Sequence, residues 1–241
     1  MKKTEFLKFI DKYHMQGLVQ QVIIDSKNEQ LFTGFTTECK SMIGQVLMKK
    51  TDDIENVKFG VYVTTDLKKI ISVMNDNMKM KFTIGNNDVP KNVVLTDGNM
   101  TATYFLSDPS IINDGQMPKI KALPDFEIEI NLTKEFVNNY IKSKDALDTT
   151  AVAFLVENDE IKLVIGYSEI NTNRITMRLG KNVDGIKFKP SVFNADFLKS
   201  LFVANKDFTT CTLRVSSKGL LNVEFDEENF ESKYFLVKLS E

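Results

Sequence analysis

The sequence predicts an α+β protein made of two similar domains, each with two helices packed on antiparallel sheet. The chain has 241 residues, which is enough for two domains of about 100–150 residues each. Two helix-like segments open at Thr4 and Thr133, 129 residues apart, and two more open at Asp66 and Asp196, 130 residues apart. Two landmarks that recur at nearly one spacing indicate a duplicated unit. Short runs rich in Val, Ile, Phe and Thr separate these segments and are typical of strands.

Four helices are expected, each with one apolar face. In the second, Leu67, Ile70, Ile71 and Met74 follow the i, i+3, i+4, i+7 spacing of a helix that buries one side. Thr65, Thr133 and Asn194 are the expected N-caps of the last three helices, because their side-chain oxygens can accept free backbone N–H groups. The expected ranges are 1–14, 66–75, 133–144 and 194–206. All four are short and one-sided, so they can lie on a sheet.

The strands fill the rest of each half. Candidates in the first half are 18–24, 31–37, 42–48, 57–64, 78–84, 93–96 and 101–106. Those in the second half are 126–130, 152–156, 161–167, 174–179, 209–215, 220–225 and 234–239. Hairpin turns are expected at 97–99, 158–159 and 218–219. The first half has no counterpart of the leading strand 126–130, so its sheet is expected to be one strand short.

A segment with three prolines separates the halves. Pro109, Pro118 and Pro124, together with Gly115, disfavour both helix and strand there. The predicted organisation is an N-terminal domain 1–108, a connector 109–124 and a C-terminal domain 125–241. The apolar anchors of the connector would be Ile111, Ile112, Met117 and Leu123.

Several function classes find no support in the sequence. The only cysteines, Cys39 and Cys211, lie far apart and are most simply two reduced core thiols, and His14 is the only histidine. There is no GxxxxGK[ST] or GxGxxG motif for phosphate binding. No apolar run is long enough to span a membrane, and the start lacks the apolar core of a signal peptide. We therefore expect a cytoplasmic protein that is not an enzyme and holds no metal or cofactor.

Charge is unevenly distributed along the chain. The helical segments hold eleven lysines and five acidic residues, a net charge of +6, while the rest carries −8. One interpretation is that lysine is a good helix former and the helices are simply solvated. The other is a basic helical face for a polyanion. The only arginines, Arg174, Arg178 and Arg214, lie in expected strands, so such a face would contact phosphates without reading sequence.

Taken together, these features resemble a sliding DNA clamp. The stretches KGLLNVEF at 218–225 and KYFLVKL at 233–239 look like the closing hairpin of clamps of the proliferating-cell-nuclear-antigen type. Residues 66–77 and 97–109 are more like the clamps of T-even-type phages. The resemblance covers essentially the whole chain in the order of its elements, and no single motif is diagnostic.

The resemblance implies a ring that encircles duplex DNA, tethers the replicative DNA polymerase and makes it processive. Two domains per chain imply a homotrimer, since the rings of this family have six domains, and a clamp loader would open and close the ring. The protein would act in the cytoplasm, that of the host if it is viral. An alternative from another class is a structural or interaction protein of duplicated α+β domains that binds no nucleic acid.

The resemblance also assigns three sets of residues. Strands 101–106 of one chain and 174–179 of the next would pair, with apolar contact from Tyr104, Phe105, Ile175 and Met177. A groove for a partner peptide would be walled by Met42, Ile111, Ile112, Leu220 and Val237. The lysines expected to line the hole are Lys3, Lys8, Lys12, Lys68, Lys69, Lys134, Lys142, Lys144, Lys199 and Lys206.

Overall fold

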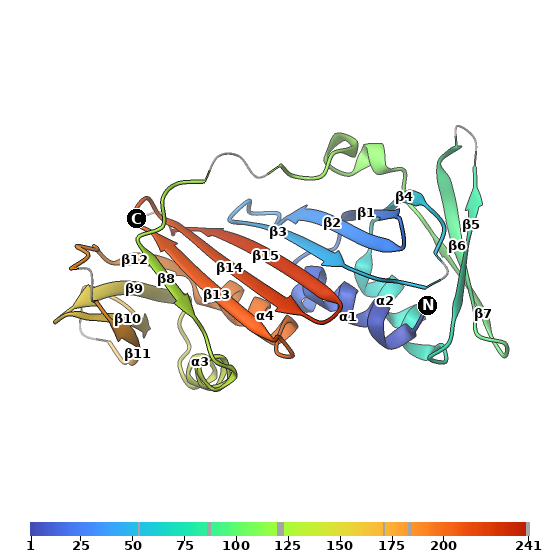
Figure 1. The fold of residues 1–241 in the computed structure, drawn as a ribbon. Coiled ribbons are helices and arrows are strands. Elements are labelled where there is room, and N and C mark those ends of the chain that lie inside the picture. Colours follow the sequence, from blue (N-terminus) through green and yellow to red (C-terminus); the bar gives the residue numbers. More distant parts are fainter. Residues whose placement is uncertain (53, 86–87, 120–122, 171, 183–184, 240–241) are drawn as a thin grey trace. The chain divides into compact units, whose positions relative to one another are not determined.

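The chain folds into two compact units. The structure, a computed structural model, describes residues 1–52, 54–85, 88–119, 123–170, 172–182 and 185–239 (Figure 1). Unit 1 comprises Met1–Ile120 with Glu228–Ser232, and unit 2 comprises Lys121–Glu227 with Lys233–Glu241. The α+β class expected from the sequence is confirmed, since helices and antiparallel strands alternate through both units.

Unit 1 contains two helices, two groups of strands and the start of the connector. Its strands run in the order β4-β1-β2-β3 in one group and β5-β6-β7 in the other. Figure 1 shows α1 and α2 below the first group and the connector turns above it. The elements are α1 (Lys3–His14), η1 (Met15–Gly17), β1 (Val22–Lys27), β2 (Gln30–Thr36), β3 (Met42–Met48), β4 (Val57–Val61), α2 (Thr64–Val73), β5 (Lys79–Ile84), β6 (Pro90–Thr96), β7 (Thr101–Phe105), η3 (Pro109–Ile111) and η4 (Asn113–Gly115).

Unit 2 repeats this plan. Its strands run in the order β11-β10-β9-β12 and β15-β14-β13-β8. The elements are β8 (Ile128–Asn131), α3 (Lys134–Ala146), β9 (Ala151–Glu157), β10 (Glu160–Ile165), β11 (Ile175–Lys181), β12 (Ser191–Asn194), α4 (Ala195–Ala204), β13 (Thr210–Ser216), β14 (Leu220–Glu227) and β15 (Phe230–Val237). Read in reverse, the order of the first group is β12-β9-β10-β11. Each of these strands corresponds to one in the unit 1 order β4-β1-β2-β3. The duplication inferred from spacing is therefore present in the topology.

The leading strand of unit 1 is reduced to a single bridge. In unit 2, β8 pairs with β13, the first strand after α4. At the matching place in unit 1, Lys2 forms an isolated antiparallel bridge with Asn77, just before β5. The backbone of Met1 and Met78 exchanges two further hydrogen bonds of 3.0 and 3.3 Å. Unit 1 therefore has a single bridge at the place where unit 2 has the strand pair β8–β13.

The helices bury the apolar faces that the sequence predicts. In unit 1, Phe6, Ile10, Leu67 and Ile71 are fully buried, and in unit 2 the aromatic rings of Tyr140 and Phe202 meet edge to face at 5.2 Å. Burying one such side chain is worth about 1.5–3 kcal/mol, so this face accounts for most of the stability of helices this short.

Two of the three expected caps are present. Thr133 accepts the backbone N–H of Phe136, and Asn194 accepts those of Asp196 and Phe197. The expected cap Thr65 is wrong, because α2 begins at Thr64, two residues earlier than expected, and its N-cap residue Val63 supplies no side-chain bond.

Three other local expectations are wrong. No strand is expected at 191–194, but the structure has β12 there. This strand has only four residues and directly follows Pro190, so the sequence pattern does not predict it. Helix α4 ends at Ala204, so Lys206 lies in the turn beyond it. Cys211 is buried on β13, which raises the pKa of its thiol to about 12, whereas Cys39 is exposed in the turn between β2 and β3 and is not a core thiol.

The connector rests on the β1–β4 strands through the buried side chain of Ile112, and Met117 and Pro118 lie close to Gly34 of β2. Ile112 is buried, and the Ser107 amide donates to the Gly60 carbonyl at 3.0 Å. A Cβ on Gly60 would lie 2.6 Å from the Ser107 oxygen and 3.0 Å from Ile112 Cδ1, so glycine is needed for this close approach. Of the other expected anchors, Met117 is half-buried, while Ile111 and Leu123 are exposed.

The end of α1 is tied to the start of α2 by Gln20. Its side-chain Oε1 accepts the Thr65 backbone N–H at 3.1 Å, and its main-chain oxygen accepts the Thr64 hydroxyl at 2.7 Å. His14, the last residue of α1, places Nε2 3.1 Å from Thr65 Oγ1. Its Nδ1 is buried without a hydrogen-bond partner among the described residues. Burial lowers the pKa of His14 below its ordinary value, and the positive charge of Lys68 lowers it further, against the opposing effect of Asp11.

This junction predicts an acid-sensitive contribution to stability. Because burial disfavours the protonated form of His14 and lowers its pKa, the unfolded chain takes up the proton first as pH falls through 6.5. The free energy of unfolding should therefore decrease between about pH 7.5 and 5 by more in the wild type than in His14→Gln, which cannot titrate. Urea unfolding at several pH values measures this difference. Parallel pH profiles for the two proteins would show that His14 makes no such contribution.

Candidate nucleic-acid interface

In unit 1, most of the lysines proposed to face DNA are already engaged. Lys3 Nζ donates to the Met74 carbonyl at 2.6 Å. Lys12 is buried with its Nζ 5.0 Å from the centre of the Phe230 ring. Lys68 forms an ion pair with Asp11 across the two helices. Lys8 is half-buried on α1.

Lys69 is the most accessible of the unit 1 set. Its side chain is 74% exposed and lies 3.6 Å from Asp66, three residues earlier in the same helix. A pair this exposed is screened by water and salt and holds its lysine weakly. The Lys69 ammonium can therefore reach an external anion.

In unit 2 the lysines again include some with partners within the chain and some that are exposed. Lys144 is buried and pairs with Asp196 at 2.8 Å, while Lys199 pairs with Asp145. Lys134 Nζ lies 5.9 Å from the centre of the Phe208 ring. Lys142 and Lys206 are exposed, and neither has an ion pair within the part of the chain that the structure describes.

This arrangement corrects the proposed lysine set. Lys12 and Lys144 cannot offer their charges to a ligand outside the chain, because both are buried and partnered within it. The exposed members of the set are Lys69, Lys134, Lys142 and Lys206, of which Lys134 lies over the Phe208 ring. Ammonium groups on flexible stems suit phosphate contact and carry no base information. The helical surface can therefore hold a polyanion loosely, with fewer phosphate contacts than the number of lysines suggests.

The two strands proposed for contact between chains are both edges. Strand β7 ends the β5-β6-β7 order and β11 ends the β11-β10-β9-β12 order. Phe105 is 69% exposed, and Ile175 and Met177 are half-buried. Tyr104 points the other way. It is buried, and its hydroxyl donates to the Val63 carbonyl at 3.0 Å, so its proposed contact with another chain is wrong.

The proposed groove residues also fall into two groups. Met42 and Ile112 each expose 1% of their surface, so they cannot wall an open groove. Ile111 and Val237 are exposed, and Leu220 is half-buried. Met42 lies on the buried side of β3, so its assignment to the groove is wrong. Burial alternates along this strand from Met42 to Met48, and the period of two could have shown that Ile43 faces outward instead.

Sequence reasoning missed a shallow, solvent-open groove between the strands and the connector in unit 1. It has a volume of about 710 Å³. Asp25, Phe32, Gln45 and Lys58 line it from the strands, and residues 115–119 line it from the connector. The Lys58 ammonium donates to the Gly115 carbonyl at 2.9 Å and so holds the connector over this space. These residues sit at outward positions of their strands, which alternation again could have identified.

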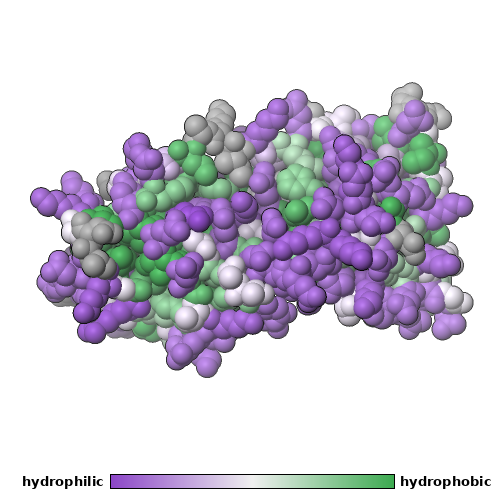
Figure 2. All heavy atoms as spheres, in the orientation of Figure 1, coloured by the Kyte–Doolittle hydropathy of each residue, from purple (hydrophilic) through white to green (hydrophobic). Residues whose placement is uncertain are grey.

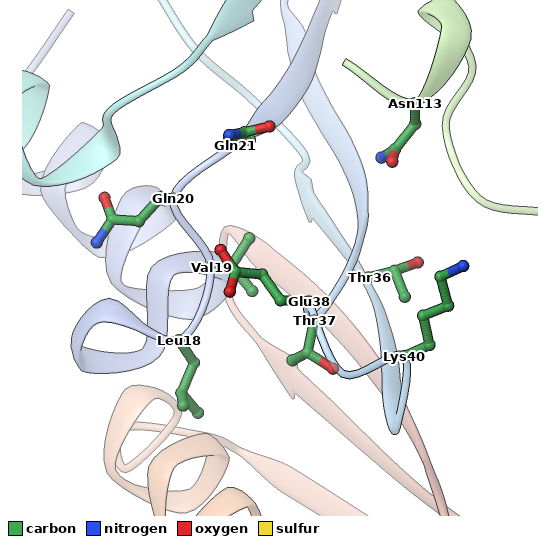
Figure 3. Close-up of a pocket in the computed structure, with 9 residues that line it drawn as sticks. All are labelled: Leu18, Val19, Gln20, Gln21, Thr36, Thr37, Glu38, Lys40 and Asn113. Carbon is green, nitrogen blue, oxygen red and sulfur yellow. The ribbon is translucent and has the colours of Figure 1, made fainter.

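A smaller cavity of about 170 Å³ lies beside the turn between β2 and β3. Figure 3 shows it between the 18–21 segment, this turn and Asn113 of the connector. Lys40 extends on the side of Asn113, while Gln20 points away toward α2. Seven of the nine lining residues are polar, and none of them is a histidine or a cysteine.

Among the described residues no cluster of three or more His, Cys, Asp or Glu side chains could hold a metal ion. None of the helices in that part of the chain is both long and apolar enough to cross a membrane. The face drawn in Figure 2 is largely hydrophilic, with hydrophobic groups showing between the polar ones.

Neither the models of known protein families nor the sequences of curated proteins match the chain. Solved structures do. A. fulgidus PCNA bound to the C-terminal region of FEN-1 matches with a TM-score of 0.76 and 16% identity, over 100% of this chain and 97% of that one. PCNA from Entamoeba histolytica matches with a TM-score of 0.74 and 15% identity, over 99% and 96%. The chain has the fold of PCNA.

A third PCNA structure is described as an assembly. The PCNA2–PCNA3 complex from Sulfolobus tokodaii matches with a TM-score of 0.73 and 12% identity, over 100% of this chain and 98% of that one. Because each match runs over nearly the full length of both chains, both units and the connector belong to the PCNA fold. The fold expected from the order of sequence elements is confirmed.

Proposed function

We propose that this protein is a sliding clamp, in which three copies form a ring around duplex DNA and tether a DNA polymerase. The observation that carries the proposal is the full-length match to PCNA together with two helix pairs that carry exposed lysines. In this role the protein performs no chemistry and needs no cofactor. A clamp loader opens the ring, because internal DNA cannot be threaded through a closed one. The protein works in the cytoplasm, that of the host if it is viral.

Ring closure uses the two edge strands. Strand β7 of one chain pairs with β11 of the next, which satisfies backbone groups that an exposed edge leaves open. Such a head-to-tail contact closes into a ring when its rotation allows. Phe105, Ile175 and Met177 supply the apolar contact. That the S. tokodaii match is a complex of two PCNA chains supports association between chains of this fold.

DNA lies against the helices without sequence readout. Lys69, Lys142 and Lys206 make the main phosphate contacts, and Lys3, Lys8, Lys68, Lys134 and Lys199 contribute where they can leave their partners within the chain. Because surface pairs are weak, phosphate can compete for Lys68 and Lys199. The ring, rather than tight contact, keeps the protein on DNA.

A partner peptide binds on the apolar residues that remain accessible. Of the set proposed from the sequence, Leu220 and Val237 remain accessible in unit 2 and Ile111 in unit 1, whereas Met42 and Ile112 are buried. The A. fulgidus PCNA structure holds the C-terminal region of FEN-1, which supports a short peptide as the form of the partner. The peptide's binding energy would be concentrated in a few anchoring side chains.

The oligomeric state tests the ring. Light scattering coupled to gel filtration should give three times the 27.5 kDa chain mass, and Ile175→Asp should lower it by placing a charge in the apolar contact. Thr176→Asp, on the exposed side of the same strand, is the matched control. A mass of one chain at every concentration would rule out the trimer.

Salt titration of DNA binding tests the lysine surface. Lys142→Gln with Lys206→Gln should lower the magnitude of the log–log slope by about 0.9 for each lysine that no longer touches a phosphate. Lys79→Gln with Lys81→Gln on β5 removes the same charge from a sheet and should leave the slope nearly unchanged. Equal slopes for the two double variants would place DNA elsewhere on the molecule.

Polymerase stimulation tests the peptide site. Val237→Asp should abolish stimulation by the DNA-loaded ring, since a carboxylate replaces an apolar anchor, while melting temperature and mass stay unchanged. Lys238→Gln, one residue further along, is the control. Full stimulation by Val237→Asp would move the polymerase contact to another surface.

A further inference from the structure

Lys68 and Lys199 occupy the same place in the two units. Each is the fifth residue of its helix, since α2 begins at Thr64 and α4 at Ala195. Each ammonium forms an ion pair with an aspartate on the neighbouring helix, Asp11 on α1 for Lys68 and Asp145 on α3 for Lys199. The same cross-helix pair is therefore present twice in one chain.

The two aspartates stand where helices disfavour a negative charge. Asp11 is three residues before the end of α1 at His14, and Asp145 is next to the last residue of α3 at Ala146. The carbonyl end of a helix carries partial negative charge, so a carboxylate there opposes helix formation. Helix stability does not explain either aspartate, whereas the neighbouring lysine does.

Both pairs lie at the surface rather than in the core. The side chains of Lys68 and Asp11 are 38% and 44% exposed, and those of Lys199 and Asp145 are 29% and 56% exposed. Lys144, by contrast, is buried against Asp196 and serves packing between α3 and α4. A solvent-exposed pair is weak, so its lysine can exchange one anionic partner for another.

We propose that Asp11 and Asp145 compete with DNA phosphates for Lys68 and Lys199, and thereby weaken the grip of the helical surface on DNA. The inference rests on the proposed function. A clamp that must move along DNA gains nothing from strong phosphate contacts, since each one adds counterion-release affinity that motion has to break. The aspartates keep two of the basic residues partly neutralised until DNA is close. They set the affinity of the surface without touching DNA.

The experiment compares two pairs of substitutions that change the net charge equally. Asp11→Asn with Asp145→Asn frees both lysines. Asp88→Asn with Asp159→Asn is the matched control, because these aspartates sit in turns with positive φ, which asparagine also adopts readily. Fluorescence anisotropy on a short duplex, at salt from about 50 to 200 mM, gives the affinity and the log–log slope.

The first variant should bind roughly two- to five-fold more tightly for each freed lysine. Its slope should steepen by about 0.9 for each lysine that gains a phosphate. The control should show only the small increase in DNA affinity that any rise in net charge produces. Adding Lys68→Gln and Lys199→Gln to the first variant should reverse its gain.

Three outcomes would overturn the inference or its premise. If the first variant and the control bind alike while the wild type binds DNA, the competition is absent. If no protein binds duplex at any salt concentration, the proposed function itself fails. If Asp11→Asn with Asp145→Asn lowers the urea midpoint, the variant is destabilised and the test moves to lysine substitutions in a protein that keeps both aspartates. There Lys68→Gln with Lys199→Gln must reduce the slope less than Lys142→Gln with Lys206→Gln, and an equal reduction contradicts the competition.

Discussion

Each helix pair must bury one face on a sheet while its other face stays open to water. The helices have 10 to 13 residues, too short to be stable alone, so burial of the apolar face has to be nearly complete. Phe6, Tyr13, Tyr140 and Phe202 meet this requirement. Once these rings are fixed on the sheets, the helical period decides where every lysine points. The charge pattern of the surface is thus a consequence of packing.

This constraint explains why few of the lysines on the helices are free to contact an external anion. Lysines near the edge of the apolar face lay their stems along it, as Lys12 and Lys144 do, and their charges then need partners inside the chain. Residues opposite the buried face, such as Lys142, keep theirs in water. A surface built in this way suits loose electrostatic contact with a polyanion and not tight binding.

In unit 1 the β1–β4 strands pack closely against the connector, whereas the β5–β7 strands end in an exposed edge strand. The β1–β4 strands bring Gly60 against the connector, where a side chain would collide with Ser107 and Ile112. Strand β7, in contrast, remains an unpaired edge with Phe105 pointing outward. An edge with an exposed aromatic residue is an aggregation hazard unless another strand covers it, which is the physical reason to expect partner chains.

The sequence by itself determined the fold class, the duplication and most of the elements. Helical periodicity located all four helices, Thr133 and Asn194 identified two caps, and residue spacing revealed the repeat, because these signals are local or depend only on sequence distance. Strand alternation also indicates which side chains of a strand face the core. Applied to β3 it places Met42 inside, and applied to β7 it separates Tyr104 from Phe105.

Only the tertiary structure decided which charged groups are free. The Asp11–Lys68 and Asp145–Lys199 pairs join residues 57 and 54 positions apart. No local pattern encodes them, because each depends on how two helices cross on a sheet. The cap on α2 is another example, since Gln20 reaches it from 45 residues away. Side-chain partners across elements are set by the packing of the elements, so the sequence can count lysines but cannot tell which of them remain available to a ligand.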